Sequence, residues 1–219
     1  MKHNLKITII LLTMFVVTQL IGLYVIQQYL PKQVYINGTL QEVTPKLPYG
    51  MQPPGDVQPI SAITSIIIAF VIAIALVLLL TKYKAAIILK LWFFFVIVIA
   101  LAITFNVFIP GLTQEFFSGI TYSEFFSLLI ALPFAFFKIF KRNILVHNFT
   151  ELLIYPGIAV IFVPILNLWS IIALLILISI YDIYAVWHSG FMQKMAKYQI
   201  EQLKIFAGFF VPYLNKKDK

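Results

Sequence analysis

One stretch of the chain carries the residue types and spacing that could do chemistry, Ser179-Ile180-Tyr181-Asp182-Ile183-Tyr184-Ala185-Val186-Trp187-His188-Ser189-Gly190. It closes an apolar run that begins near Leu168, and Asp182 places a carboxylate inside that run. A charge at the centre of a membrane helix costs about 2.5–3.5 kcal/mol on insertion scales, so such a residue marks a functional site by default. We expect no other acidic residue to lie as deep within an apolar run. Asp182 is therefore the leading candidate for a functional residue.

The residues by themselves leave three interpretations of Asp182 open. It can be one half of a carboxylate pair that activates water, a proton or cation relay in a carrier, or a structural anion paired with a basic residue of another helix. Burial of a carboxylic acid disfavours its charged form, which suits acid–base catalysis and proton coupling alike. Tyr184 lies one helical turn beyond Tyr181, so both hydroxyls are expected near one helix face with Asp182 beside them.

Other polar residues are weaker candidates. Glu151, near the start of an apolar run, is expected to be an interfacial cap or snorkelling group, or a second polar member of the site. Trp187 and His188 fall at the end of the Asp182 run and are typical of a membrane boundary. His3 and His147 have no metal-ligand spacing, and no Ser/His/Asp set or phosphate-binding glycine loop occurs. We therefore expect neither a metal nor a cofactor.

The composition is that of an integral membrane protein. Hydrophobic residues make up 62% of the 219 residues, charged residues only 11%, and the mean hydropathy is +0.98. Soluble domains carry about 25% charged residues, so a water-soluble fold is excluded. The chain has no cysteine, which excludes disulfides, thiolate metal sites and a cysteine nucleophile.

Six apolar runs are long enough to cross a membrane, where about 20 residues are needed. Lipid offers the backbone no hydrogen-bond partners, so each run is expected to be a helix and the fold to be all-α and polytopic. The runs are Ile7–Ile26, Ile60–Leu80, Ala85–Ile109, Ser118–Phe137, Leu145–Val163 and Leu168–Trp187.

Residues 29–59 form the longest polar segment, a loop between the first two predicted helices. Its prolines rule out a long helix, so we expect turns and extended structure, with a short hairpin around Val34–Val43. The other connections between predicted helices are short.

Lysine and arginine are distributed very unequally between the two sides. With the N-terminus in the cytoplasm, fourteen lie on the inner side and only Lys32 and Lys46 on the outer side. The positive-inside rule therefore predicts a cytoplasmic N-terminus and explains the net charge of +8 without nucleic acid. The inner residues are Lys2, Lys6, Lys82, Lys84, Lys90, Lys138, Lys141, Arg142, Lys194, Lys197, Lys204, Lys216, Lys217 and Lys219.

The sequence after Gly190 differs in character from the apolar runs. Over Phe191–Tyr213, apolar residues repeat at helical spacing among polar and basic ones, which predicts an amphipathic helix at the inner membrane surface or over a cavity. We therefore divide the chain into a six-helix membrane domain, residues 1–190, and a cytoplasmic-face helix with a charged tail, residues 191–219. No internal repeat occurs, which argues against inverted-repeat transporters.

The residues around Asp182 carry a resemblance to a known family. Tyr181-Asp182, followed by Ala185-Val186 and Gly190, resembles the sixth membrane helix of presenilin-type intramembrane aspartyl proteases, including their archaeal homologues. That helix carries one of the family's two catalytic aspartates in its Tyr-Asp motif. The sequence from Asn148-Phe149-Thr150-Glu151 to Val163-Pro164 is similar to the family's fifth helix, and the predicted topology matches the family's N-terminal portion.

This resemblance implies that Asp182 is catalytic and that Tyr181 shapes the site and contacts substrate. The implied activity is hydrolysis of membrane-spanning helices without a metal or cofactor. The expected location is the plasma membrane of a prokaryote. The family's Gly-x-Gly-Asp and Pro-Ala-Leu motifs do not occur in this sequence. We therefore expect a C-terminal part, whether removed, processed or encoded separately, to supply the second aspartate, without which the chain is inactive.

Two other functions fit the same residues. Asp182 could couple ions in a noncatalytic channel or carrier, or it could pair helices in an assembly subunit. The expected partners are the lipid bilayer, membrane-protein substrates and the C-terminal part, with no nucleic acid.

Overall fold

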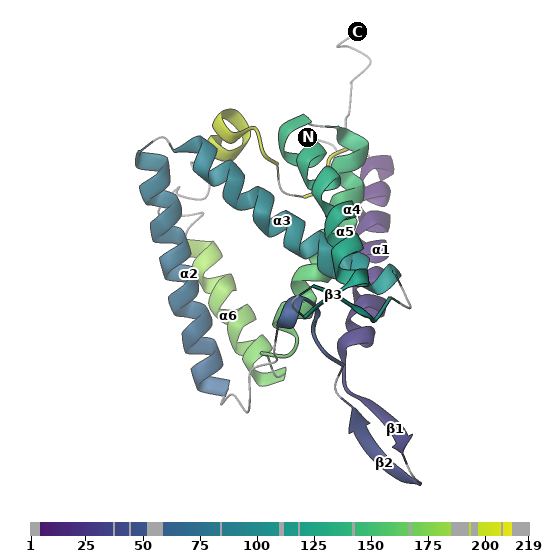
Figure 1. Ribbon diagram of the computed structural model, residues 1–219. Helices are drawn as coiled ribbons and strands as arrows, with labels where there is room; N and C mark the ends of the chain where they lie inside the picture. Colours follow the sequence, from purple (N-terminus) through teal and green to yellow (C-terminus); the bar gives the residue numbers. More distant parts are fainter. Residues whose placement is uncertain are drawn as a thin grey trace. The chain divides into compact units, whose positions relative to one another are not determined.

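The structure is a computed structural model that describes residues 5–36, 38–43, 45–51, 59–83, 85–109, 112–117, 119–141, 143–166, 168–184, 193, 197–206 and 208–211. The described chain is mostly helical, as predicted (Figure 1). Its long helices are α1 (Leu5–Tyr29), α2 (Pro59–Lys82), α3 (Ala86–Phe108), α4 (Tyr122–Phe136), α5 (Ile144–Phe162) and α6 (Leu168–Tyr184).

Four helical segments are long and apolar enough to cross a membrane. They are α1, α3, α5, and α4 together with the π-helical turn η2 (Phe137–Lys141) that continues it. The described apolar stretches of α2 and α6 are shorter, Ile63–Leu76 and Leu168–Tyr184. The chain is thus a multi-pass membrane protein, with helices near all six predicted positions.

Two small hairpins interrupt the helices. Strands β1 (Lys32–Ile36) and β2 (Thr39–Val43) pair antiparallel, which confirms the hairpin predicted in the long loop. Strands β3 (Glu115–Phe117) and β4 (Ile120–Thr121) form a second hairpin that the hydrophobic pattern did not predict. It delays the start of α4 from the predicted Ser118 to Tyr122, where Thr121 and Glu124 form a capping box.

The amphipathic helix predicted over Phe191–Tyr213 does not extend through its C-terminal part. A π-helical turn, η4 (Gln199–Leu203), ends at Lys204, which has a left-handed backbone with φ of 58°. Residues 204–206 and 208–211 are not helical. The residues of this predicted helix before Gln199 lie largely outside the described part of the chain.

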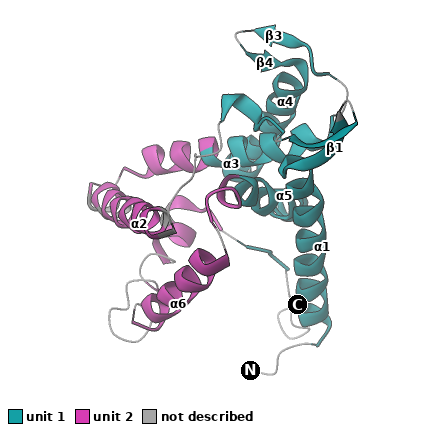
Figure 2. Ribbon diagram, turned by 90° about the horizontal axis from the view of Figure 1, so that it is seen from below, with its two compact units in different colours: residues 1–51, 96–160, 207–219 teal, residues 52–95, 161–206 magenta. Residues whose placement is uncertain are grey.

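The chain forms two compact units (Figure 2). Unit 1 comprises residues 1–51, 96–160 and 207–219, and unit 2 comprises residues 52–95 and 161–206. In unit 2, α2 packs against α6. In unit 1, α1, the C-terminal half of α3, α4 and most of α5 surround a core that includes the fully buried Leu101 and Ile103.

Helices α3 and α5 come into backbone contact in unit 1. A Cβ atom on Gly157 would lie 1.9 Å from the Ala100 carbonyl oxygen, so only glycine allows this approach. Next to it, the buried Thr104 hydroxyl donates a hydrogen bond to the Leu153 carbonyl oxygen at 2.8 Å. Small residues and interhelical hydrogen bonds are the usual means of packing helices in lipid, which offers no hydrophobic driving force between them.

A polar chain of contacts links α1, α3 and α4. The Tyr29 hydroxyl donates to the Ile103 carbonyl oxygen and accepts from the Asn106 side chain, both at 3.2 Å. The Ser123 hydroxyl in turn lies 2.6 Å from the Asn106 side-chain oxygen. These contacts connect the end of α1 to the start of α4 through α3.

The turn η1 (Pro48–Gly50) in the long loop is bound to the start of α4 by hydrogen bonds. The buried Glu124 carboxylate accepts one hydrogen bond from the Tyr49 backbone N–H and another from the Thr121 N–H, each at 2.6 Å. The Tyr49 hydroxyl lies 2.7 Å from the Ser127 hydroxyl. Burial raises the pKa of the Tyr49 phenol to about 12, and the Ser127 hydrogen bond opposes that rise.

We predict that Gly157→Ala destabilises the protein by about 3 kcal/mol, the upper end of the cost of overpacking, because the added methyl group meets backbone. Gly22→Ala is the matched control, since its Cβ would lie 4.0 Å from the Pro156 side chain, an ordinary contact. Thermal unfolding in detergent micelles measures both variants. Equal melting temperatures for Gly157→Ala and Gly22→Ala would contradict the close α3–α5 packing.

We predict that Tyr49 titrates only near pH 12 and that its ionisation releases the loop. Because the phenol has a higher pKa in the folded state, its contribution to stability is complete below pH 10 and is lost as the pH rises toward 12. The measurement is the phenolate absorbance during an alkaline titration. The difference between wild type and Tyr49→Phe is expected to show one late transition, whereas the exposed Tyr35→Phe serves as control. A Tyr49 transition at or below pH 10 would rule out the docked loop.

Candidate functional site

Asp182 lies near the end of α6 with an exposed side chain. Within the part of the chain that the structure describes, the carboxylate has neither a hydrogen-bond donor nor a cation beside it. It therefore has no described partner for the structural ion pair that was one interpretation of this residue. A carboxylate in this position is available to a further acidic group or to a ligand.

Tyr181 is oriented by the neighbouring helix of unit 2. Its half-buried ring makes an edge-to-face contact with the ring of Phe70 on α2, with centroids 5.6 Å apart and an interplanar angle of 87°. Edge-to-face pairs of this kind are favourable because the ring edge and ring face carry opposite partial charges. This contact holds the ring of Tyr181, which directly precedes Asp182 in the sequence, and packs α6 against α2.

The rest of the Tyr-Asp stretch lies mostly outside the described residues. Tyr184 is exposed, and residues 185–190, which include Trp187 and His188, lie outside the described residues. Among the described residues, no group of three metal-ligating side chains occurs.

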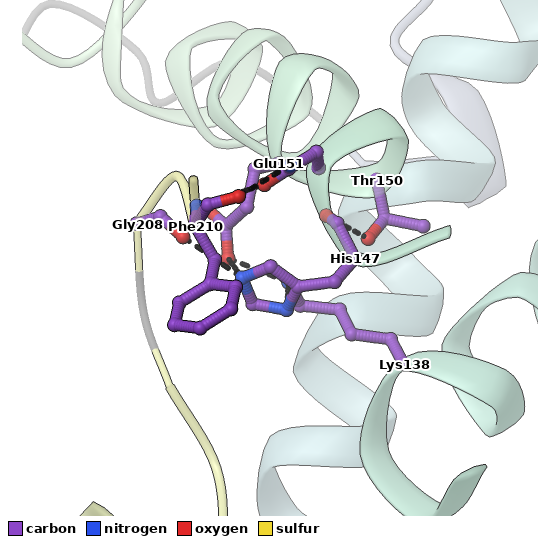
Figure 3. Close-up of polar contacts among 7 residues, drawn as sticks. Lys138, His147, Thr150, Glu151, Gly208 and Phe210 are labelled. Carbon is purple, nitrogen blue, oxygen red and sulfur yellow. Dashed lines mark hydrogen bonds and ion pairs between the residues drawn. The ribbon is translucent and has the colours of Figure 1, made fainter. Parts of the chain in front are cut away.

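A second group of charged side chains is buried in unit 1 (Figure 3). The Lys138 ammonium, from η2, lies 2.5 Å from a carboxylate oxygen of Glu151 on α5, and the two side chains are 3% and 5% exposed. The expectation that Glu151 is an interfacial cap or snorkelling group is therefore wrong. Asp182 is also not the sole acidic residue within an apolar segment, because Glu151 lies within α5 and is buried.

The buried charges depend on each other. An isolated charge in a low-dielectric interior costs several kcal/mol, and the cost falls only when an opposite charge or hydrogen bond is close. The π-helical turn of η2 brings Lys138 to face α5, where His147 and Glu151 lie four residues apart on one helix face. Lys138 and Glu151 are thirteen positions apart in the sequence. The sequence signalled this ion pair only by placing both charges beside apolar runs.

His147 continues the group in one defined protonation state. Its Nδ1 lies 3.2 Å from the Lys138 Nζ, and its Nε2 lies 2.8 Å from the Gly208 carbonyl oxygen. An ammonium can only donate a hydrogen bond and a carbonyl can only accept one. His147 is therefore neutral, with its proton on Nε2, donating to Gly208 and accepting from Lys138.

Comparison with known proteins identifies the family. The family model described as "Signal-peptide peptidase, presenilin aspartyl protease" matches residues 12–215, which include Tyr181-Asp182. The chain belongs to this family of intramembrane aspartyl proteases. Neither the comparison with curated proteins nor that with solved structures found a match. The family confirms the resemblance seen at the Tyr-Asp stretch, while the individual roles of Asp182 and Tyr181 stay predictions.

We predict that Lys138→Met costs about 3–5 kcal/mol in the free energy of unfolding, because it leaves the Glu151 carboxylate buried without a counter-charge. The double variant Lys138→Met/Glu151→Gln is expected to recover most of that loss, since no unpaired charge remains. Denaturant unfolding in detergent gives the coupling energy of the double-mutant cycle. Costs that simply add would show that Lys138 and Glu151 do not interact.

Proposed function

We propose that this chain is the N-terminal part of an intramembrane aspartyl protease and that Asp182 is one of its two catalytic aspartates. The observation that carries the proposal is the family match over residues 12–215, which spans the Tyr181-Asp182 pair. The exposed carboxylate of Asp182 supports it, because a catalytic acid must be able to meet a second acid and a substrate. The second aspartate comes from a C-terminal part, as no Gly-x-Gly-Asp occurs in this sequence.

The proposed reaction is hydrolysis of a peptide bond by two carboxyl groups. Two carboxylates held together cannot both ionise, so they share one proton. The ionised group removes a proton from a water molecule as its oxygen attacks the scissile carbonyl carbon, and the protonated group polarises the carbonyl oxygen. The C–N bond then breaks and the leaving nitrogen takes a proton, which yields a carboxylic acid and an amine.

The substrates in this proposal are membrane-spanning helices of other proteins. A helix must unwind locally before cleavage, because its hydrogen-bonded backbone hides the carbonyl carbons. Tyr181 would contact the unwound segment beside Asp182, and its packing on Phe70 supports a fixed position for such a contact.

The proposed topology has six membrane helices and a cytoplasmic N-terminus. The fourteen inner and two outer basic residues support this orientation in a prokaryotic plasma membrane. In this topology, α2 and α6 cross the membrane together with the four longer helical segments. Residues 191–219 lie at the cytoplasmic face.

We predict that Asp182→Asn and Asp182→Ala, in the protein completed by its C-terminal part, lower proteolysis of a membrane-spanning substrate at least about 100-fold. Membrane insertion and thermal stability are expected to stay unchanged, because the carboxylate is exposed. Glu42→Gln, which neutralises an exposed carboxylate in the β1–β2 hairpin, is the control and should retain full activity.

Retained proteolysis in purified Asp182→Ala would contradict this assignment. Proton flux into liposomes is measured in parallel. Flux that survives an aspartyl-protease transition-state analogue and disappears in Asp182→Asn would instead indicate an ion-coupled carrier.

A further inference from the structure

Residues 208–211 form a non-helical segment, here called the strap, that lies against the N-terminal end of α5 within unit 1 (Figure 3). The strap begins at Gly208, whose φ of 106° is a conformation that residues with side chains rarely adopt. Glycine at this position lets the chain turn onto α5.

Each of the first three strap residues contacts α5. The Gly208 carbonyl accepts from His147 Nε2 at 2.8 Å, and the Phe209 ring packs at an angle on Tyr155 with centroids 6.5 Å apart. Asn148 binds both backbone groups of Phe210, accepting from its N–H at 2.9 Å and donating to its carbonyl at 2.8 Å. The Asn148 side-chain amide thus satisfies the N–H and the carbonyl of Phe210, as the backbone of a paired β-strand would.

The hydrogen-bonded contacts belong to α5 side chains and to the strap backbone. Almost any strap sequence could make them, whereas on α5 they require a donor at position 147 and an amide at position 148. The other ring nitrogen of His147 also has a partner. Its Nδ1 accepts a hydrogen bond from Lys138, which is itself paired with Glu151. The buried ion pair therefore holds the histidine in the state that binds the strap.

We infer that His147 and Asn148 are positioning residues of the protease, which fasten the strap to α5 and so set the point from which the chain continues toward the second aspartate. This inference rests on the proposed function, and it commits to a C-terminal part that continues the same chain beyond the strap. Asp182 precedes the strap in the sequence, so the strap lies between the two acids along such a chain. A chain anchored at this point can present the second acid in fewer positions than a free one.

Hydrogen–deuterium exchange tests the attachment directly, using the completed protein in detergent micelles. Asn148→Ala removes the acceptor of the Phe210 N–H and is expected to speed exchange of that amide about 10-fold, the value of a net hydrogen bond. His147→Leu is expected to act in the same direction. His147→Gln retains an N–H donor for Gly208 and should restore slow exchange.

Kinetics on a membrane-spanning substrate separate positioning from mere folding. For Asn148→Ala we expect kcat, normalised to folded protein, to fall about 10-fold with KM unchanged, and His147→Gln to recover more activity than His147→Leu. Asn143→Ala is the matched control, because Asn143 accepts from the N–H groups of Leu145 and Val146 at the start of α5 and does not bind the strap. It should leave Phe210 exchange and kcat unchanged.

Unchanged exchange at Phe210 in Asn148→Ala would overturn the inference, because the strap would not depend on that side chain. Faster exchange with unchanged kcat would overturn it as well, because the attached strap would then position nothing. Failure of the proposed function looks different: Asp182→Ala would retain proteolysis, whatever the exchange at Phe210.

Discussion

The Lys138–Glu151 ion pair is the interaction on which the polar organisation of unit 1 depends. Both charges are buried, and each is tolerated only because the other lies 2.5 Å away. The lysine also faces His147, which in turn holds the Gly208 carbonyl. One pairing thus joins η2, α5 and the strap, three segments that are separate in the sequence.

Packing between α3 and α5 complements this pair. The backbone contact at Gly157 and the Thr104–Leu153 hydrogen bond hold the middle of α5 against α3, while the ion pair holds its N-terminal end against η2. Helix α5 is therefore held at two points along its length, at its middle by α3 and near its N-terminal end by η2. A helix held in this way is suited to carry a strap whose position matters, because rigid elements position groups more precisely than loops do.

The acids of α5, α6 and α4 illustrate different uses of a carboxylate in a membrane protein. Glu151 is buried and neutralised by Lys138, so its charge serves packing and orientation. Asp182 is exposed and has no partner among the described residues, and the proposed function gives it the role of a catalytic acid. The Glu124 carboxylate is a third case, since it caps α4 and binds the long loop through Tyr49.

The sequence by itself determined the features that depend on neighbouring residues. Apolar runs predicted the positions of all the long helices, turn residues predicted the β1–β2 hairpin, and Tyr181-Asp182 indicated the family, because each signal lies within one continuous stretch. Thr121 and Glu124 also carried a capping signal that the longer apolar run obscured. Only the tertiary structure decided that Glu151 pairs with Lys138 and that the described residues after Lys204 are not helical. Those outcomes depend on which side chains of separate segments meet, and hydrophobic periodicity holds no information about such contacts.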